Sequence, residues 1–442
     1  MNLGLIAALS FGILLLSFVA GLPLCFGLGG VAMVMGLIFY GPGSMFLATQ
    51  GAYGTMLSFV LTAIPLFIFM GSLLSESGIA DDLYSAMYHW MGPIKGGLAI
   101  GTVLICTVMA AMCGVVAAGV VTMGIIAIPS MQKRNYRTEL ITGSIMAGGS
   151  LGALIPPSIV MMIYGLISRQ SVGQLFMGGV FPGFILSFFY CTYIAIRSYL
   201  QPQIAPALPA EERGSLKEKV AGLRAVVLPI LIILSVLGSI FLGVATPTEA
   251  ASVGCVAVLI AAALHRRLTW RVLKKSAFYT FGLSGMVMWV VLGASVFSRI
   301  FFSVGGADLL LGLLGMEINR WMIMIAMQIS LILLGMIMDD VAMLMIAGPI
   351  YTPIIVALGF HPVWFGVLFV INLQIAYLSP PFGYALFYMR GVAPESITTG
   401  QIYRSIIPFI ILQIIGLSLV MALPQLALWL PGMMLGEVAP TW

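Results

Sequence analysis

The sequence predicts an all-α polytopic membrane protein, built as an inverted-topology repeat with two re-entrant helical hairpins and two proline-broken spans. The first observation behind this prediction is composition: 61% of the 442 residues are hydrophobic and 7% are charged, whereas soluble domains carry about 25% charged residues. The second is a series of apolar runs of about 18 residues or more, which fits helical spans and not a β-barrel. The third is a proline pair that occurs twice.

The proline pairs lie in residues 154–158 (LIPPS) and 378–383 (LSPPFG), both inside strongly apolar stretches. Proline has no N–H and displaces the helical hydrogen bond of the carbonyl four residues back, so a helix breaks at each pair. In hydrocarbon, broken backbone is tolerated only where it packs in protein or lines a cavity. Two matching breaks therefore point to a transporter's binding site near the middle of the membrane.

A constant offset of 224 residues relates other landmarks as well. It separates Pro156 from Pro380, and it also separates Gly21-Leu22-Pro23 from Ala245-Thr246-Pro247 and Pro129 from Pro353. Chance matches at one fixed offset are rare, so we predict an internal repeat. The repeats are expected over residues 1–196 and 225–442, joined by a linker at 197–224.

The basic residues predict that the two repeats have opposite orientations. Lys and Arg lie in 133–137 of the first half and in 265–275 of the second, while their counterparts, 354–361 and 41–44, carry no Lys or Arg. Under the positive-inside rule the basic loops and the basic linker are cytoplasmic, which places both termini on the outer side. We expect residues 1–20 to be a retained first span, because they lack the basic start and the cleavage site of a signal peptide.

The hairpins are predicted from span length. Residues 96–132 carry no charge over 37 positions, which is too long for one span and tight for two, so we expect a span followed by a re-entrant hairpin. The predicted hairpins lie near 105–131, with a turn near 114–119, and near 325–355; the broken spans lie near 138–168 and 362–390. Residues 81–91 and 268–277 are expected to be amphipathic helices at the membrane interface.

Asp339 and Asp340 are the only acids in residues 321–360. A carboxylate at the centre of a span costs about 2.5–3.5 kcal/mol, so a function is expected. Adjacent helical positions differ by about 100°, so the pair is not expected to face one site. We predict that Asp340 caps a helix beginning at Val341, and that Asp339 belongs to an ion or substrate site.

Other candidates each have a structural alternative. Gly114 and Gly335 suit tight turns at the hairpins, although packing alone would also explain them. Arg299 either snorkels or pairs, or it binds a substrate carboxylate. Ser158 offers a hydroxyl ligand, although bonding to its own backbone is commoner, and the same holds for Ser379. Four residues predict a helix start by threonine capping: Thr246, Pro247, Thr248 and Glu249.

Several classes of chemistry are not indicated. The five cysteines lie in apolar stretches without ligand spacing and are interpreted as packing residues. No metal, nucleotide-phosphate or nucleophile motif is present, so no cofactor is expected. The net charge of +5 lies in a few loops, which indicates membrane topology and not nucleic-acid binding.

Several motifs together resemble the large membrane subunit of tripartite ATP-independent periplasmic (TRAP) transporters. They are 64–71 (IPLFIFMG), 77–80 (SGIA), 96–99 (GGLA), 155–158 (IPPS), 245–251 (ATPTEAA) and 379–383 (SPPFG). The resemblance implies an elevator-type, ion-transporter-like, sodium-coupled importer in the bacterial inner membrane. It also implies two protein partners, a small four-helix membrane subunit and a periplasmic substrate-binding protein.

The resemblance also implies site residues. The sodium sites would involve Gly114, Val115, Val116, Gly335, Met338, Asp339, Ser379 and Pro380. Many family members have serines at the two valine positions and threonine at 379, so the first sodium site here would rest on carbonyls. The first hairpin turn with its two valines, together with residues 380–388 at the second proline pair, resembles the branch for mannitol, chloroaromatic and 2-oxo acid substrates.

Substrate contacts are expected at the helix breaks, where the broken backbone packs in protein or lines a cavity. Half-helix N-termini there would favour an anionic substrate. The candidates are Pro156, Pro157, Ser158, Pro381 and Arg299.

We therefore expect sodium-driven import of a small organic anion delivered by a binding protein. A stand-alone symporter of the same architecture is the first alternative. The second is an intramembrane enzyme using Asp339 and Asp340, which their adjacency disfavours because a catalytic pair must converge on one bond.

Overall fold

The computed structural model describes residues 9–435 apart from 11, 15, 19, 213–215, 307–318 and 382. Every regular element within these residues is a helix. The predicted span at 1–20 falls largely outside the described residues, as does Phe382 of the second proline motif.

The first half is a succession of helices separated by short turns. They are α2 (Leu24–Phe39), α3 (Gly43–Met56), α4 (Ala63–Glu76), α5 (Ile79–Met91), α6 (Gly97–Cys113), α7 (Val116–Gln132), α8 (Thr138–Ser150), α9 (Ile159–Ser168) and α10 (Val172–Leu200).

The second half repeats much of this order. Its helices are α11 (Leu216–Phe241), α12 (Pro247–Leu264), α13 (Trp270–Phe301), α15 (Arg320–Gly335), α16 (Asp340–Ala357), α17 (Pro362–Leu378), α18 (Tyr384–Val392), α19 (Thr399–Ala422) and α20 (Gln425–Leu435).

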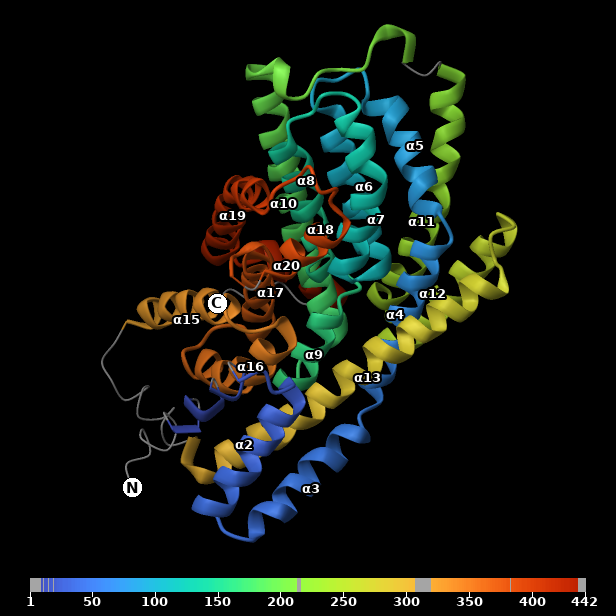
Figure 1. Ribbon diagram of the computed structural model, residues 1–442. Helices are drawn as coiled ribbons and strands as arrows, with labels where there is room; N and C mark the ends of the chain where they lie inside the picture. Colours follow the sequence, from blue (N-terminus) through green and yellow to red (C-terminus); the bar gives the residue numbers. More distant parts are fainter. Residues whose placement is uncertain are drawn as a thin grey trace.

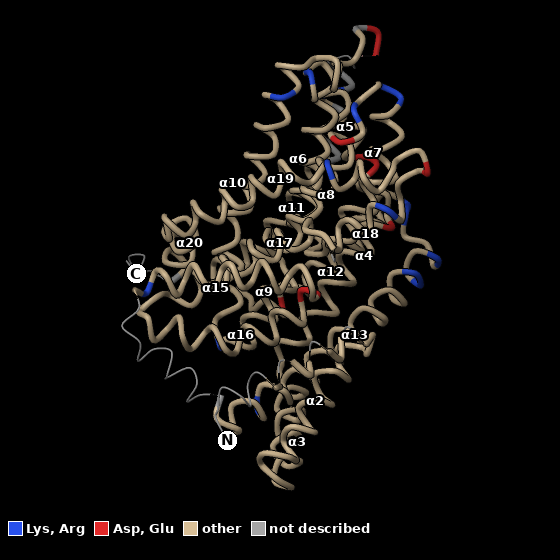
Figure 2. The backbone as a smooth tube through the Cα atoms, turned by 60° about the vertical axis from the view of Figure 1, so that its left-hand side comes forward, with Lys and Arg blue, Asp and Glu red and all other residues tan. Residues whose placement is uncertain are grey.

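Among the described residues, six helices are long and apolar enough to cross a membrane. They include α10, α12, α16 and α19, together with α13 and the segment Phe59–Glu76 that contains α4. In Figure 1, α13 crosses the molecule obliquely with α2 and α3 beside one end. Lys and Arg gather at the opposite end, near α5, α7 and the start of α13 (Figure 2).

The helix bounds of the two halves follow the 224-residue offset. Shifting α8 by 224 gives 362–374, which lies within α17, and shifting α9 gives 383–392, which matches α18. Shifting α2 gives 248–263, which lies within α12. The opposed orientation of the halves stays a prediction.

The halves differ where α3 and α4 are separate helices and their counterpart α13 is continuous. Pro65 lies in the first turn of α4 and cannot continue a helix arriving from α3. The equivalent position, 224 residues later, is Trp289, which interrupts nothing. Residues 268–277 are therefore not a separate interfacial helix as predicted: Thr269 caps α13, its side chain accepting from the Val272 N–H.

Residues 81–91 form a helix within α5 that packs one face along α6 and α11; its place at the membrane interface stays a prediction. One further expectation needs correction. Residues 96–132 hold only the two 17-residue helices α6 and α7. The arms of the hairpin use the whole apolar stretch, so no separate span precedes the first hairpin.

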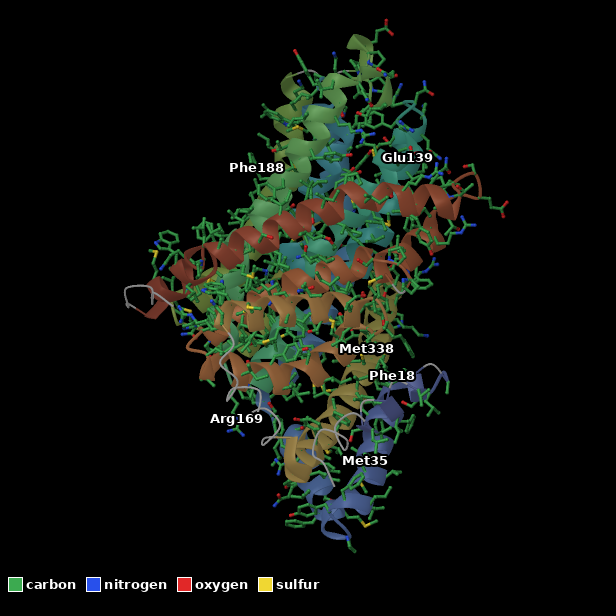
Figure 3. All side chains as sticks on the ribbon, turned by 90° about the vertical axis from the view of Figure 1, so that its left-hand side faces the viewer. Phe18, Met35, Glu139, Arg169, Phe188 and Met338 are labelled. Atoms are coloured by element: carbon green, nitrogen blue, oxygen red, sulfur yellow. The ribbon has the colours of Figure 1, made fainter. Side chains whose placement is uncertain are left out.

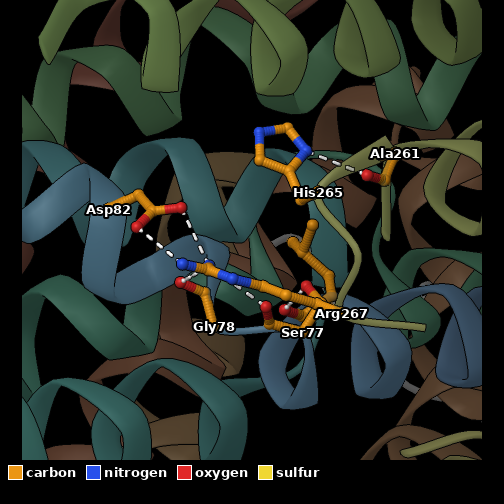
Figure 4. Close-up of polar contacts among 7 residues, drawn as sticks. Ser77, Gly78, Asp82, Ala261, His265 and Arg267 are labelled. Atoms are coloured by element: carbon orange, nitrogen blue, oxygen red, sulfur yellow. Dashed lines mark hydrogen bonds and ion pairs between the residues drawn. The ribbon is translucent and has the colours of Figure 1, made fainter. Parts of the chain in front are cut away.

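An arginine joins the two halves near the basic end. Arg267 follows α12 and forms a bidentate ion pair with Asp82 of α5, with distances of 2.8 and 3.0 Å. Its Nη1 also donates to the carbonyl of Gly78 at 2.7 Å. Gly78 has φ +71° at the turn between α4 and α5, so Arg267 fixes that turn (Figure 4).

Candidate functional site

The first hairpin turn is a two-residue connection. Gly114 ends α6 with φ +63°, Val115 is extended, and α7 begins at Val116. A left-handed residue that closes a helix is most often glycine, because it has no Cβ. A Cβ on Gly114 would lie 2.0 Å from the carbonyl oxygen of Pro157, so this turn packs directly on the first proline pair.

The second hairpin turn lies between Gly335, the last residue of α15, and Asp340, the first residue of α16. A Cβ on Gly335 would lie 2.4 Å from the Cβ of Ala376. This close approach brings the end of α15 against the last turn of α17, just before the second break. Each hairpin therefore packs against its own broken helix.

Both broken helices are present as predicted, and the peptide bond within each proline pair is cis. Ser158 caps α9: its hydroxyl accepts from the Met161 N–H at 3.3 Å and donates to the carbonyl of Ala153. The hydroxyl of Ser379 donates to the carbonyl of Ile375 at 2.7 Å. Both serines thus bond to local backbone, which was the alternative interpretation of these residues.

A cavity of about 120 Å³ lies where the turns and breaks meet. Its lining comes from residues 114–117 and 339–341 at the hairpin turns, from the start of α9, from three tyrosines around the second break, and from one face of α13. We call it the tip cavity. Cavities for drug-sized ligands measure about 300–1,000 Å³, so the tip cavity suits small ligands.

Four helices begin at the tip cavity: α7, α9, α16 and α18. The first N–H groups of a helix have no partner within the helix and carry a partial positive charge, which favours anions. The arm α6 ends at Gly114, which lines the cavity, and the carbonyls of a helix end favour cations. The cavity therefore offers backbone N–H groups to an anion and backbone carbonyls to a cation.

Asp339 and Asp340 both line the tip cavity, contrary to the prediction that they face apart. Asp339 is an extended residue, 5% exposed, and it is the N-cap of α16: its Oδ1 accepts from the Ala342 N–H at 3.2 Å. Asp340 is the first helical residue and not the cap as predicted. The 100° separation holds only when both residues are helical, and α16 begins one residue earlier than expected.

Three tyrosines around the second break line the tip cavity, although they were not among the residues predicted for the site. The Tyr377 hydroxyl donates to Oδ2 of Asp340 at 2.6 Å, while Oδ1 of Asp340 accepts from the Val341 N–H. Tyr384 and Tyr388, one turn apart on α18, also line the cavity, with ring centroids 6.2 Å apart. The four-residue spacing of Tyr384 and Tyr388, seven residues after Tyr377, was the available signal.

Other predicted site residues lie near the tip cavity but outside its lining. Pro156, Pro157 and Ser158 are buried, whereas Pro381 is exposed and Pro380 is half-buried. Met338 is buried and lines a separate cavity with Ser330 and Tyr351.

Arg299 lies apart from the tip cavity. It lines a larger cavity of about 1,040 Å³ between α3, α13 and α16, together with Arg169. Its Nη1 donates to Oε1 of Gln50 at 3.1 Å. In Figure 3, Arg169 lies at a different level of the molecule from Met338, which belongs to the second hairpin turn.

The predicted helix start at residues 246–249 is confirmed. Thr246 and Glu249 form a capping box at the start of α12, with Pro247 in the first turn. The Thr246 N–H donates to Oε2 of Glu249 at 2.8 Å. These residues have a structural role there.

Two helical hairpins that meet two broken helices at one small cavity, in a chain of apolar helices, are the arrangement of a membrane transport protein. Residues 11–426 match the family described as tripartite ATP-independent periplasmic transporter, DctM component. The chain belongs to this family. It is thus the membrane permease component of a binding-protein-dependent transporter of small organic solutes, and a transport protein rather than an enzyme.

Relatives span nearly the whole chain. The C4-dicarboxylate TRAP transporter large permease protein DctM of Pseudomonas aeruginosa is 31% identical over 409 residues, or 91% of this chain and 93% of the relative. The sialic acid TRAP transporter large permease protein SiaM of Vibrio cholerae is 30% identical, covering 96% and 98%. The isethionate TRAP transporter permease protein DctMQ of Oleidesulfovibrio alaskensis is 29% identical, covering 96% of this chain and 66% of the relative.

Solved structures share the fold. The Alcanivorax borkumensis YdaH transporter superposes with a TM-score of 0.64 at 14% identity, covering 94% of this chain and 98% of that one. Neisseria gonorrhoeae MtrF gives 0.60 at 12% identity, covering 88% and 84%. The relatives name different solutes, so the branch suggested by the sequence stays a prediction.

Proposed function

We propose that this permease imports a small organic acid together with sodium ions, and that the tip cavity is the site that carries both. The observation behind the proposal is that two carboxylates and four helix N-termini share one cavity of about 120 Å³.

The cation half of the proposal rests on Asp339 and Asp340. Within the described residues that line the cavity there is no Lys or Arg to balance them. Two carboxylates close together in a low-dielectric site repel each other, and a bound cation removes this cost. Sodium binds oxygen ligands, which the carboxylates and the carbonyls near Gly114 and Gly335 supply.

The anion half rests on the helix N-termini. Their N–H groups would hold the carboxylate of a solute without a buried arginine, as in other transporters with broken helices. The names of the relatives, C4-dicarboxylate, sialic acid and isethionate, all denote small organic acids, which supports this solute class. Bound sodium beside the carboxylates would lower the repulsion between Asp339 and the incoming anion.

The mechanical part is an elevator. The hairpins and broken helices would move as one body past α13, whose face from Tyr279 to Val287 forms the opposite wall of the tip cavity. Residues 1–196 and 225–442 would be inverted repeats, with the linker 197–224 in the cytoplasm and both termini on the outer side of the inner membrane.

Two partners complete the proposed transporter: a small four-helix membrane subunit and a periplasmic binding protein that delivers the solute. The isethionate relative DctMQ, of which this chain covers 66%, is long enough to include a further membrane component.

The test is solute uptake by the complete complex reconstituted in lipid vesicles, with candidate organic acids and with or without an inward sodium gradient. We expect uptake only with the gradient and the binding protein. Uptake that ignores the gradient would remove the sodium assignment. Full uptake by this chain alone would favour a stand-alone symporter.

A further inference from the structure

A second polar pocket lies away from the tip cavity, between α8, α10 and α19. It measures about 200 Å³ and receives an arginine from each of three segments: Arg137 just before α8, Arg197 near the end of α10, and Arg404 in the second turn of α19. Glu139 is the one acid that lines it. The pocket therefore carries an excess of positive charge.

The three arginines differ in how they are paired. Arg137 forms an ion pair with Glu139 at 2.9 Å. The Nη1 of Arg197 donates to the hydroxyl of Tyr193 at 2.9 Å, and the guanidinium lies 6.0 Å from the centre of that ring. Arg404 is exposed and makes no hydrogen bond or ion pair with the part of the chain that the structure describes. A guanidinium is thus available for an outside anion.

This pocket does not lie on the proposed solute route. It shares no lining residue with the tip cavity. Its helix α19 packs on α8, α10, α17, α18 and α20, whereas α13, the far wall of the tip cavity, packs on α2, α3, α4 and α16. In Figure 3, Glu139 lies well away from Met338 and from Arg169.

Apolar side chains continue from the pocket along the outside of both helices. Ile407 and Ile411 of α19 are 56% and 52% exposed, and Phe188 and Ile196 of α10 are 67% and 56% exposed. In a multi-pass membrane protein such side chains contact acyl chains. The arginines therefore lie at one end of an exposed apolar surface, and arginines at the end of such a surface typically reach the phospholipid headgroups.

We propose that this pocket binds the phosphate of an anionic phospholipid of the phosphatidylglycerol class, with its acyl chains along α10 and α19. Guanidinium groups bind phosphate oxygens in a bidentate manner, which suits Arg404 and Arg197. Basic pockets between membrane helices on the cytoplasmic side are a known type of lipid site. The loops around this pocket are those that the charge distribution places in the cytoplasm.

The experiment uses the full chain in nanodiscs of phosphatidylcholine with a small amount of spin-labelled lipid, either phosphatidylglycerol or phosphatidylcholine. The immobilised fraction of each label gives the preference of the protein surface for the anionic headgroup. We expect a clear preference in the wild type. Arg404→Gln should reduce it about fivefold, since each basic residue near an anionic headgroup contributes roughly that factor.

Two variants serve as controls. Arg404→Lys keeps the charge and should retain most of the preference. Arg266→Gln removes an exposed arginine at the same end of the molecule, outside the pocket, and should leave the preference unchanged. The labelled phosphatidylcholine signal reports whether each variant is still folded in the bilayer.

Four results would overturn the proposal. One is a wild-type preference that survives Arg404→Gln, and another is an equal loss in Arg266→Gln, which would indicate general surface charge. The third is Arg404-dependent binding of inorganic phosphate without any preference for labelled phosphatidylglycerol, which would indicate a soluble anion. Loss of the preference when the complete complex is assembled would assign the arginines to a protein partner instead.

Discussion

At the residue scale, the contact between Tyr377 and Asp340 fixes one carboxylate of the tip cavity. The hydroxyl donates at 2.6 Å, and hydrogen bonds to charged groups contribute about 1.5–3 kcal/mol. Asp340 is thereby held in one orientation, whereas Oδ2 of Asp339 is left for a ligand once Oδ1 has accepted the capping bond.

Tyr377→Phe should lower the free energy of unfolding by about 1.5–3 kcal/mol, because it leaves a carboxylate oxygen without its donor. Tyr377→Phe combined with Asp340→Asn should cost less than the sum of the two single changes. Thermal unfolding of the four purified proteins measures this coupling. Strict additivity would mean that the contact contributes nothing.

A second residue, Gly114, holds the first hairpin against the first proline pair. Gly114→Ala should destabilise the protein. A residue with a Cβ in the left-handed region costs roughly 1–2 kcal/mol, and the loss should be larger here because the new Cβ would meet the Pro157 carbonyl at 2.0 Å. Gly285→Ala is the control: it lies in α13 with nothing within 4 Å, and it should stabilise by about 0.5–1 kcal/mol. Equal effects of the two changes on thermal unfolding would show that the turn does not need glycine.

The sequence predicts these residues unevenly. Proline and glycine act through their own backbone, so the breaks at 156–157 and 380–381 and the turn at Gly114 follow from local rules. The cap was assigned to Asp340 instead of Asp339, because a cap depends on the exact first residue of a helix. The tyrosines depend on which helices meet, which a single stretch of sequence does not contain.

At the element scale, most helices begin and end near proline, glycine or capping residues, as α12 does at Thr246. The sequence was less informative where no such residue occurs. Residues 268–277 continue into α13 without a break, and the amphipathic pattern that suggested an interfacial helix is simply the first part of a 32-residue helix.

Arg267 provides a test at this scale. Arg267→Lys loses the bidentate pair with Asp82, and we expect a loss of about 1 kcal/mol, because the pair is partly exposed. Hydrogen exchange should accelerate at the amides of residues 77–84, around the turn between α4 and α5. Arg266→Lys changes the neighbouring exposed arginine and should leave that exchange as it is. Unchanged exchange in Arg267→Lys would mean that the turn is held by other contacts.

At the scale of the whole molecule, the repeat organises the fold. The 224-residue offset places α8 and α9 opposite α17 and α18, and each broken helix meets its own hairpin. The offset and the two pairs of helices are visible in the sequence. Their meeting at one cavity with α13 is not, because it depends on packing between segments more than 100 residues apart.

The opposed orientation of the repeats predicts which loops are reached from outside the cell. Cysteines replacing Pro42 and Ala357 should react with a membrane-impermeant maleimide applied from the periplasmic side. Cysteines replacing Lys133 and Arg266 should react only after the inner membrane is permeabilised. Labelling of positions 133 and 357 from the same side would contradict the inverted repeat.

The central claim is that the tip cavity binds sodium through Asp339, and its most direct test is thermal unfolding of the purified chain in sodium or potassium chloride at equal ionic strength. Sodium at ten times its dissociation constant should stabilise the wild type by about 1.4 kcal/mol relative to potassium. Asp339→Asn keeps a capping side chain but removes the charge, so it should lose this response, while Arg299→Gln should keep it. An Asp339→Asn variant that sodium stabilises as strongly as the wild type would contradict the account.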